Sequence, residues 1–149
     1  MPSENSELFS WNMYCDGASR GNPGPASTGV IVYESTGNPI IQNGYFLGVM
    51  TNNEAEYSAL ARGLELVFEH FEKNQNKQSG FKLNIFLDSE LVVKQIKGEY
   101  KVKNERLKPL HAKVKNLLVR LSSYSIQHVP REKNKEADAL ANEALDAAV

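Results

Sequence analysis

Two segments far apart in the chain alternate apolar and polar residues and then reach an aspartate. FSWNMYCD ends at Asp16, and FKLNIFLD ends at Asp88. Alternation with a period of two is typical of a strand that buries one of its faces. The sequence therefore predicts two strands that each end at an aspartate, and they restrict the possible folds more than any other feature does.

The remaining sequence predicts further strands and several helices. VIVYE and PIIQNGYFLG are two more strands joined by the turn STGN, and with the first strand they form an antiparallel meander. TNNE, at residues 51–54, fits a capping box that begins a helix of about five turns. We expect further helices over residues 89–96, 104–121 and 134–147, and a fifth strand at YSIQHVP.

This order of elements predicts an α/β fold with a five-stranded mixed sheet, in which an antiparallel meander of three strands is joined by two parallel strands. Helices should flank both faces. The 149 residues, 41% hydrophobic and 23% charged, suffice for one packed core. We expect residues 1–7 to be disordered and residues 8–149 to form a single domain. Sites in such sheets gather at the carboxyl ends of parallel strands, where Asp16 and Asp88 would lie.

Composition and charge exclude several classes of protein. The segment MPSENSELFS has neither a basic region nor an apolar one, and no apolar run is long enough to span a bilayer, so we expect a cytoplasmic protein without a membrane segment. Cys15 is the only cysteine, which excludes an internal disulfide and a cysteine zinc site and leaves it a packing role. The net charge of −1 hides nine basic and two acidic residues within 94–120, a segment that suits contact with phosphates.

Acidic residues stand at the ends of several predicted elements: Asp16, Glu54, Glu56, Asp88 and Asp138. Carboxylates that converge repel one another and cannot all ionise near neutral pH unless a cation compensates their charge. A donor set made only of oxygens suits Mg²⁺ or Mn²⁺ rather than zinc, and two such ions about 4 Å apart can hydrolyse a phosphodiester. Each acid also has a structural explanation, at a helix N-terminus or a strand end, and helical geometry does not decide between Glu54 and Glu56.

Four motifs, in their order and spacing, resemble the ribonuclease HI family along almost the entire chain: YCDGASRGNPGPASTG, TNNEAEYSAL, FLDSELVVKQIKGEYKVKN and VPREKNKEADALANEA. The resemblance implies a ribonuclease H-like fold and an endoribonuclease that cuts the RNA strand of RNA-DNA hybrids, leaving 5'-phosphate and 3'-hydroxyl ends. It also implies Mg²⁺ as the cofactor, with Mn²⁺ as a substitute, and a monomer. The family's four metal-binding carboxylates fall on Asp16, Glu56, Asp88 and Asp138, which leaves Glu54 as the cap.

The resemblance further implies which residues contact the hybrid. The turn GNPGP matches a loop that approaches the minor groove, where the 2'-hydroxyl distinguishes RNA from DNA. In this turn, Gly21 and Asn22 are implied to contact the RNA strand. Asn52 and Asn53 are implied to contact the hybrid, and Thr51 a phosphate of the DNA strand. Lys101 and Lys103 are implied to contact the DNA backbone. Each group also has a purely structural explanation: a Gly/Pro turn for residues 21 and 22, helix capping for residues 51–53, and a solvated helix face for the two lysines.

The chain departs from the family pattern at three places. His128 lies in the predicted strand rather than in a flexible loop, so Arg131 is the better candidate for the position of the family's loop histidine. Because arginine stays protonated, Arg131 would act on the scissile or leaving phosphate rather than as a base. The connection KGEYKVKNERLKP lacks the tryptophan of the basic protrusion found in some relatives, and Glu90 stands where some relatives have glutamine. We also expect no separate hybrid-binding domain before residue 9.

Two other functions remain open at this point. The same fold and metals could act on double-stranded RNA or structured DNA, or the chain could be a non-catalytic hybrid-binding module. A binding module gains nothing from four carboxylates that repel phosphate. An ATP-binding phosphotransferase is not supported, because the sequence has no GxxxxGK[ST] loop.

Overall fold

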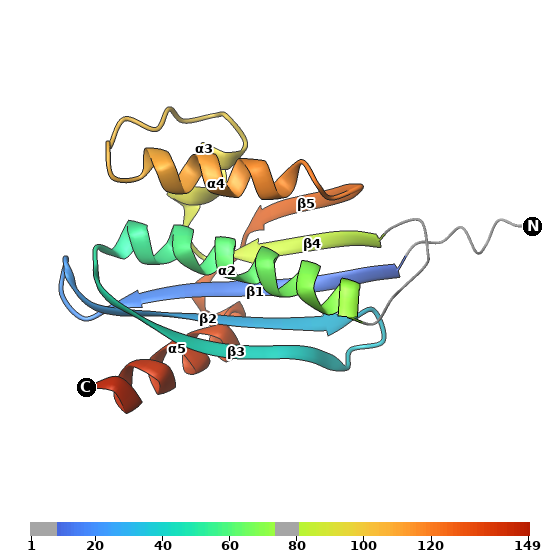
Figure 1. Cartoon of the computed structure of the whole chain (residues 1–149), viewed down its shortest axis with the longest axis horizontal. Coiled ribbons are helices and arrows are strands. Elements are labelled where there is room, and N and C mark those ends of the chain that lie inside the picture. Colours follow the sequence, from blue (N-terminus) through green and yellow to red (C-terminus); the bar gives the residue numbers. More distant parts are fainter. Residues whose placement is uncertain (1–8, 74–80) are drawn as a thin grey trace, which may run out of the picture.

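The computed structural model describes residues 9–73 and 81–149, and its strands form one five-stranded sheet in the order β3-β2-β1-β4-β5 (Figure 1). The strands are β1 (Phe9–Ser19), β2 (Gly24–Glu34), β3 (Pro39–Met50), β4 (Phe81–Leu87) and β5 (Ser123–His128). β1, β2 and β3 pair antiparallel, whereas β4 pairs parallel with both β1 and β5. The predicted mixed sheet is confirmed, while the expectation for residues 1–7 lies outside the described residues.

Helices cover both faces of this sheet, as predicted. They are α2 (Asn52–Lys73), α3 (Glu90–Ile96), α4 (Lys108–Leu118) and α5 (Lys135–Ala148), with the short 3-10 helix η1 (Arg131–Lys133) before α5. α2 packs on β1 and β2 and against α4, while α5 crosses β1, β2 and β3 on the opposite face (Figure 1). None of the helices in the described ranges is long and apolar enough to cross a bilayer.

The main core lies between the sheet and α2. Its side chains come from alternate positions of the strands and from the inner face of the helix, and the fully buried ones include Met13, Cys15, Val30, Val32, Leu60, Leu64, Leu83, Ile85 and Leu87. Burying one aliphatic side chain of this size stabilises a fold by roughly 1.5–3 kcal/mol. This packing fixes the register of β1 against β4, which sets the position of the residues that follow them.

On the opposite face, α5 lies unusually close to β2. A Cβ on Gly29 would come closer than 3.0 Å to backbone atoms of Ala137 and Ala141, so only glycine permits this approach. The Ser27 hydroxyl also donates a hydrogen bond to the Ala141 carbonyl. The first turn of α5, which carries Asp138, is thereby held against the sheet.

Several predicted element boundaries were wrong. β2 begins at Gly24 rather than at Val30. β1 does not end at Asp16 but continues to Ser19, because residues 16–19 pair with residues 26–29 of β2, and the turn shrinks to residues 20–23. The helix expected over residues 104–121 is the shorter α4, with Pro109 in its first turn. A proline in the interior of a helix would remove a backbone hydrogen bond and clash with the preceding turn, so the helix begins just before it.

Candidate functional site

Asp16 and Asp88 follow the last pair of the parallel β1–β4 ladder. That pair is Cys15 and Leu87, so each aspartate is the next residue along the chain. β1 continues past this point along β2, but β4 ends. The two carboxylates consequently lie side by side at the carboxyl end of the parallel strands.

α2 brings Glu56 to the same place. The Gly17 N–H donates to Glu56 Oε1 at 3.2 Å, and a Cβ on Gly17 would come closer than 3.0 Å to backbone atoms of Ala55. The first turn of α2 can therefore approach the strand only because residue 17 is a glycine. Glu56 points at the end of β1 as a result.

Glu54 has a different role, and the predicted capping box is present. Glu54 Oε1 accepts from the Thr51 N–H at 2.8 Å, and the Glu54 N–H donates to the Thr51 hydroxyl at 3.2 Å. These reciprocal bonds satisfy two backbone donors at the start of α2. The alternative between the two glutamates is thus decided by geometry, since Glu54 is bonded to the helix end and Glu56 faces the aspartates.

The carboxylate oxygens of Asp16, Glu56 and Asp88 all lie within 4.8 Å of one another. Asp138 adjoins this cluster from the first turn of α5, where its side chain is a hydrogen-bonding neighbour of Asp16. Asp16, Glu56 and Asp138 line a pocket of about 520 Å³ together with Arg131 and other polar residues. Four separate segments therefore contribute an acid to one place.

Burial and mutual repulsion disfavour the charged form of these acids. Burial, followed by the charges of Glu56, Asp88 and Asp138, raises the pKa of Asp16 to about 10. Burial and the charge of Asp88 raise the pKa of Glu56 to about 8, although the Gly17 N–H and Arg131 partly oppose the shift. A donor set made only of oxygens, which ionises fully only with a compensating cation, fits Mg²⁺ or Mn²⁺.

Arg131 and His128 occupy different environments. Arg131 begins η1, lines the acidic pocket and lies close enough to Glu56 for its charge to lower the pKa of that carboxyl. His128 is exposed at the end of the edge strand β5, opposite Leu87, and does not line that pocket. The prediction that His128 belongs to a strand is confirmed.

The turn at residues 20–23 adjoins the start of α2. Gly21 and Asn22 are exposed, and Gly21 has a φ of 114°, which favours glycine. Asn22 Oδ1 accepts from the Asn52 N–H at 2.9 Å, and Asn52 lines the acidic pocket. Asn53 is exposed beside Asn52.

Lys101 and Lys103 lie elsewhere. With Tyr100 they line a separate hollow of about 470 Å³ on the connection between α3 and α4. Lys94 Nζ lies 5.2 Å from the centre of the Tyr100 ring, which ties this connection to α3. The basic residues are thus available on a surface separate from the acids.

Sequence reasoning missed three polar residues around the acids. Asn134 Nδ2 donates to the Cys15 carbonyl at 2.8 Å and joins the start of α5 to β1. Asn142 lines the acidic pocket and donates to Asp138, and Arg20 contacts Asn142 from the turn. The spacing of four residues between Asp138 and Asn142 was the available signal, because such residues share one helix face.

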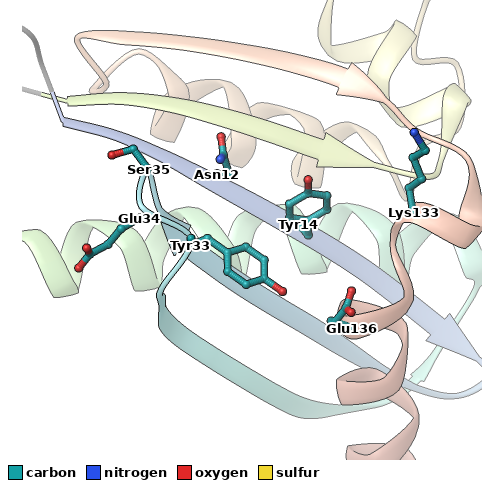
Figure 2. A pocket seen from close by; sticks show the side chains of 8 residues that line it. Asn12, Tyr14, Tyr33, Glu34, Ser35, Lys133 and Glu136 are labelled. Carbon is teal, nitrogen blue, oxygen red and sulfur yellow. The ribbon is translucent and has the colours of Figure 1, made fainter.

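A second pocket, of about 230 Å³, lies on the α5 side of the sheet (Figure 2). Tyr14 stacks on Phe86 at 4.7 Å and meets Tyr33 edge-on at 5.9 Å. Lys133 from η1 and Glu136 from the first turn of α5 also line this pocket (Figure 2). Among the described residues, the group of three acids that could hold a metal lies in the acidic pocket and not in this one.

Comparison with known protein sequences identifies relatives over most of the chain. A family model described as reverse transcriptase-like matches residues 14–144. Ribonuclease HI of Halobacterium salinarum is 41% identical over 134 residues, which are 89% of this chain and 63% of that protein. A bifunctional protein of Mycobacterium tuberculosis is 37% identical over 89% of this chain and 35% of its own length. The chain therefore spans less than two thirds of these curated relatives.

Comparison with solved structures gives the same fold. RNase H1 from Halobacterium salinarum has a TM-score of 0.84 at 38% identity, over 93% of this chain and 98% of that one. LC11-RNase H1 in complex with RNA/DNA hybrid has a TM-score of 0.85 at 40% identity, over 93% and 98% of the two chains. Overlap this extensive takes in most of the sheet and of the helices that flank it.

Proposed function

This chain belongs to the ribonuclease H-like, reverse transcriptase-like family, and on that premise we propose that it is an endoribonuclease that hydrolyses the RNA strand of RNA-DNA hybrids. The observation that carries the proposal is the convergence of the Asp16, Glu56 and Asp88 oxygens within 4.8 Å. The likeness to a ribonuclease whose structure includes such a hybrid supports the choice of substrate. The chain would act as a monomer.

Asp16, Glu56, Asp88 and Asp138 would hold divalent metal ions, Mg²⁺ or Mn²⁺. Bound ions of this kind supply Lewis acidity at the scissile phosphate and compensate the negative charge of the carboxylates. The chain contributes the placement of the carboxylates, since each comes from an element anchored by packing or by hydrogen bonds. Such anchoring is what a preorganised site requires.

The reaction is the addition of water across one phosphodiester bond. The water oxygen bonds to phosphorus, the bond from phosphorus to the 3' oxygen breaks, and that oxygen takes up a proton. The products carry 5'-phosphate and 3'-hydroxyl ends. Arg131, beside Glu56, would stabilise charge on the scissile or leaving phosphate, because a guanidinium that stays protonated cannot accept the proton from water.

Substrate contacts would come from the turn and from the start of α2. Gly21 would offer backbone and Asn22 its side-chain NH₂, since the Asn22 oxygen already accepts from Asn52. Asn52 and Asn53 would contact the hybrid, and Thr51 a DNA-strand phosphate. The exposed pair Lys101 and Lys103 would follow the DNA backbone.

The test is gel-resolved cleavage of one labelled RNA strand, paired with DNA, paired with RNA, or single. Each substrate is incubated with Mg²⁺, Mn²⁺ or EDTA, and with wild type, Asp16→Asn or Glu143→Gln, an exposed control on α5. Metal-dependent cutting of only the DNA-paired RNA, lost in Asp16→Asn alone, is the expected result. Cutting of another duplex instead would show that the protein acts on that duplex. Tight hybrid binding without cutting would favour a binding module.

A further inference from the structure

Asn142 bridges an acid of the site and the turn at residues 20–23. Its Nδ2 donates to the Asp138 carbonyl at 3.0 Å and to Asp138 Oδ1 at 3.2 Å. Its Oδ1 accepts from Arg20 Nη2 at 3.4 Å, and the same Arg20 nitrogen forms an ion pair with Asp146 at 2.5 Å. The result is a continuous chain of contacts from Asp146 through Arg20 and Asn142 to Asp138.

The chemistry of these contacts matches an asparagine at position 142. The side chain must donate to the carboxylate of Asp138 and accept from the guanidinium of Arg20, and an amide does both in one orientation. An aspartate would repel Asp138, and a lysine or arginine would repel Arg20. An alanine would leave both partners without this contact.

The turn is also fixed to the other helix of the site. Asn22 Oδ1 accepts from the Asn52 N–H at the start of α2, and the Ser19 hydroxyl donates to the Met50 carbonyl at 2.9 Å. Residues 20–23 therefore join α2, which carries Glu56, to α5, which carries Asp138. The same turn contacts Asp138 indirectly, through Arg20 and Asn142.

We propose that Asn142 is a positioning residue that orients the Asp138 carboxylate toward Asp16, and that Arg20 couples this orientation to the substrate-facing turn. The inference rests on the proposed function. Hydrogen bonds to the outer side of a metal-binding carboxylate fix its orientation and strengthen the site. Because coupling between two binding events is reciprocal, a hybrid bound at the turn and a metal bound at Asp138 would each raise the affinity for the other.

A purely structural role for Asn142 makes a different prediction. An asparagine on a helix often bonds to the carbonyl of the preceding turn, which affects only the helix. In that case Asn142→Ala would change the melting temperature and nothing else. Alanine has the higher helix propensity, so this variant is expected to remain folded.

The experiment compares wild type, Asn142→Ala and Asn116→Ala, a matched control on the exposed face of α4. Mn²⁺ binding to the metal-free proteins is measured by calorimetry, without substrate. We expect Mn²⁺ to bind Asn142→Ala about tenfold more weakly and the control unchanged. The kcat of Asn142→Ala should recover with excess Mn²⁺, while its KM for the hybrid should depend less on the Mn²⁺ concentration than that of wild type, because the coupling is lost. Unchanged Mn²⁺ affinity and kcat in Asn142→Ala would overturn the proposal.

Arg20→Ala and the double variant with Asn142→Ala test the coupling. Arg20 is 43% exposed in its side chain, so its removal leaves the core intact. Arg20→Ala should weaken Mn²⁺ binding less than Asn142→Ala does, and the double variant should resemble Asn142→Ala alone. If the losses of Mn²⁺ affinity in the two single variants add up in the double variant, Arg20 does not act through Asn142, because the effects of residues that act through one another are not additive. If wild type cuts no hybrid, the proposed function fails, whereas the Mn²⁺ comparison still tests the positioning of Asp138.

Discussion

Cys15 and Leu87 form the last pair of the parallel ladder between β1 and β4, and the residue after each is an aspartate. Both side chains of this pair are fully buried, so the register that aligns Asp16 with Asp88 is held by the core. A slip of one residue would turn the apolar side chains of a strand to the opposite face. The packing of the core and the placement of the acids are therefore one structural property.

The first prediction concerns the stability of the metal-free protein. The pKa of Asp16 is raised from its usual 3.8 to about 10, so the fold favours the protonated acid. The stabilisation of the fold that comes from protonated Asp16 is fully present below about pH 4 and is lost as the pH rises toward 10. Because the neutral amide of the Asp16→Asn variant has no charge to bury, that variant should be more stable than wild type at pH 9, by about 1–3 kcal/mol. Urea unfolding in EDTA at pH 5 and pH 9 measures the difference, and equal pH slopes for the two proteins would contradict it.

The second prediction concerns metal binding and pH. Asp16 and Glu56, with pKa values raised to about 10 and about 8, must lose protons before they bind a cation. Mg²⁺ affinity should therefore rise from pH 6 to pH 8, with net release of protons. Calorimetry in buffers with different ionisation enthalpies counts the released protons. Binding without proton release would show that the acids are already ionised, and Asp16→Asn should release fewer protons than wild type.

Much of the architecture could be predicted because it depends on local patterns. Alternation identified β1 and β4, and the pattern from Thr51 to Glu54 identified the start of α2. The continuation of β1 to Ser19 could not be predicted, because glycine, alanine and serine also suit a loop and only pairing with β2 makes them a strand. Likewise, the choice of Glu56 came from a family resemblance, since the contact that aims it at the aspartates comes from Gly17, 39 residues away.

The hydrogen-bond partners around Asp138 likewise could be predicted only in part from the sequence. Asn142 is four residues from Asp138 on α5, yet its other partner, Arg20, is 122 residues distant in the sequence. Helical spacing can indicate the first contact but not the second. Contacts that depend on tertiary packing therefore supplied the residues that sequence reasoning missed.

The third prediction concerns the approach of α5 to the sheet. Alanine at position 29 would place its Cβ closer than 3.0 Å to backbone atoms of Ala137 and Ala141, so α5 must move away. Gly29→Ala should lower the free energy of unfolding by about 3 kcal/mol and weaken Mg²⁺ binding, because Asp138 moves with the helix. Gly37→Ala is the control, since its Cβ meets no atom within 4 Å and only its φ of 98° is unfavourable. It should lower stability by about 1 kcal/mol and leave Mg²⁺ affinity unchanged. Equal metal affinity in the two variants would contradict this account.

The fourth prediction separates Arg131 from His128. Arg131 lines the acidic pocket and its charge lowers the pKa of Glu56, so Arg131→Gln should raise that pKa further. If Arg131 also stabilises charge on the phosphate, kcat should fall about tenfold or more even at saturating metal. His128 is exposed outside the pocket lining, and His128→Ala should change kcat by less than about twofold and leave its pH profile intact. Initial rates from pH 6 to pH 9, at saturating Mg²⁺ and hybrid, measure both variants. A large loss of activity in His128→Ala, with a shift of the acidic or alkaline limb of the pH–rate profile, would contradict this assignment. The histidine would then carry the proton transfer, and the function assigned to Arg131 would be shared with it.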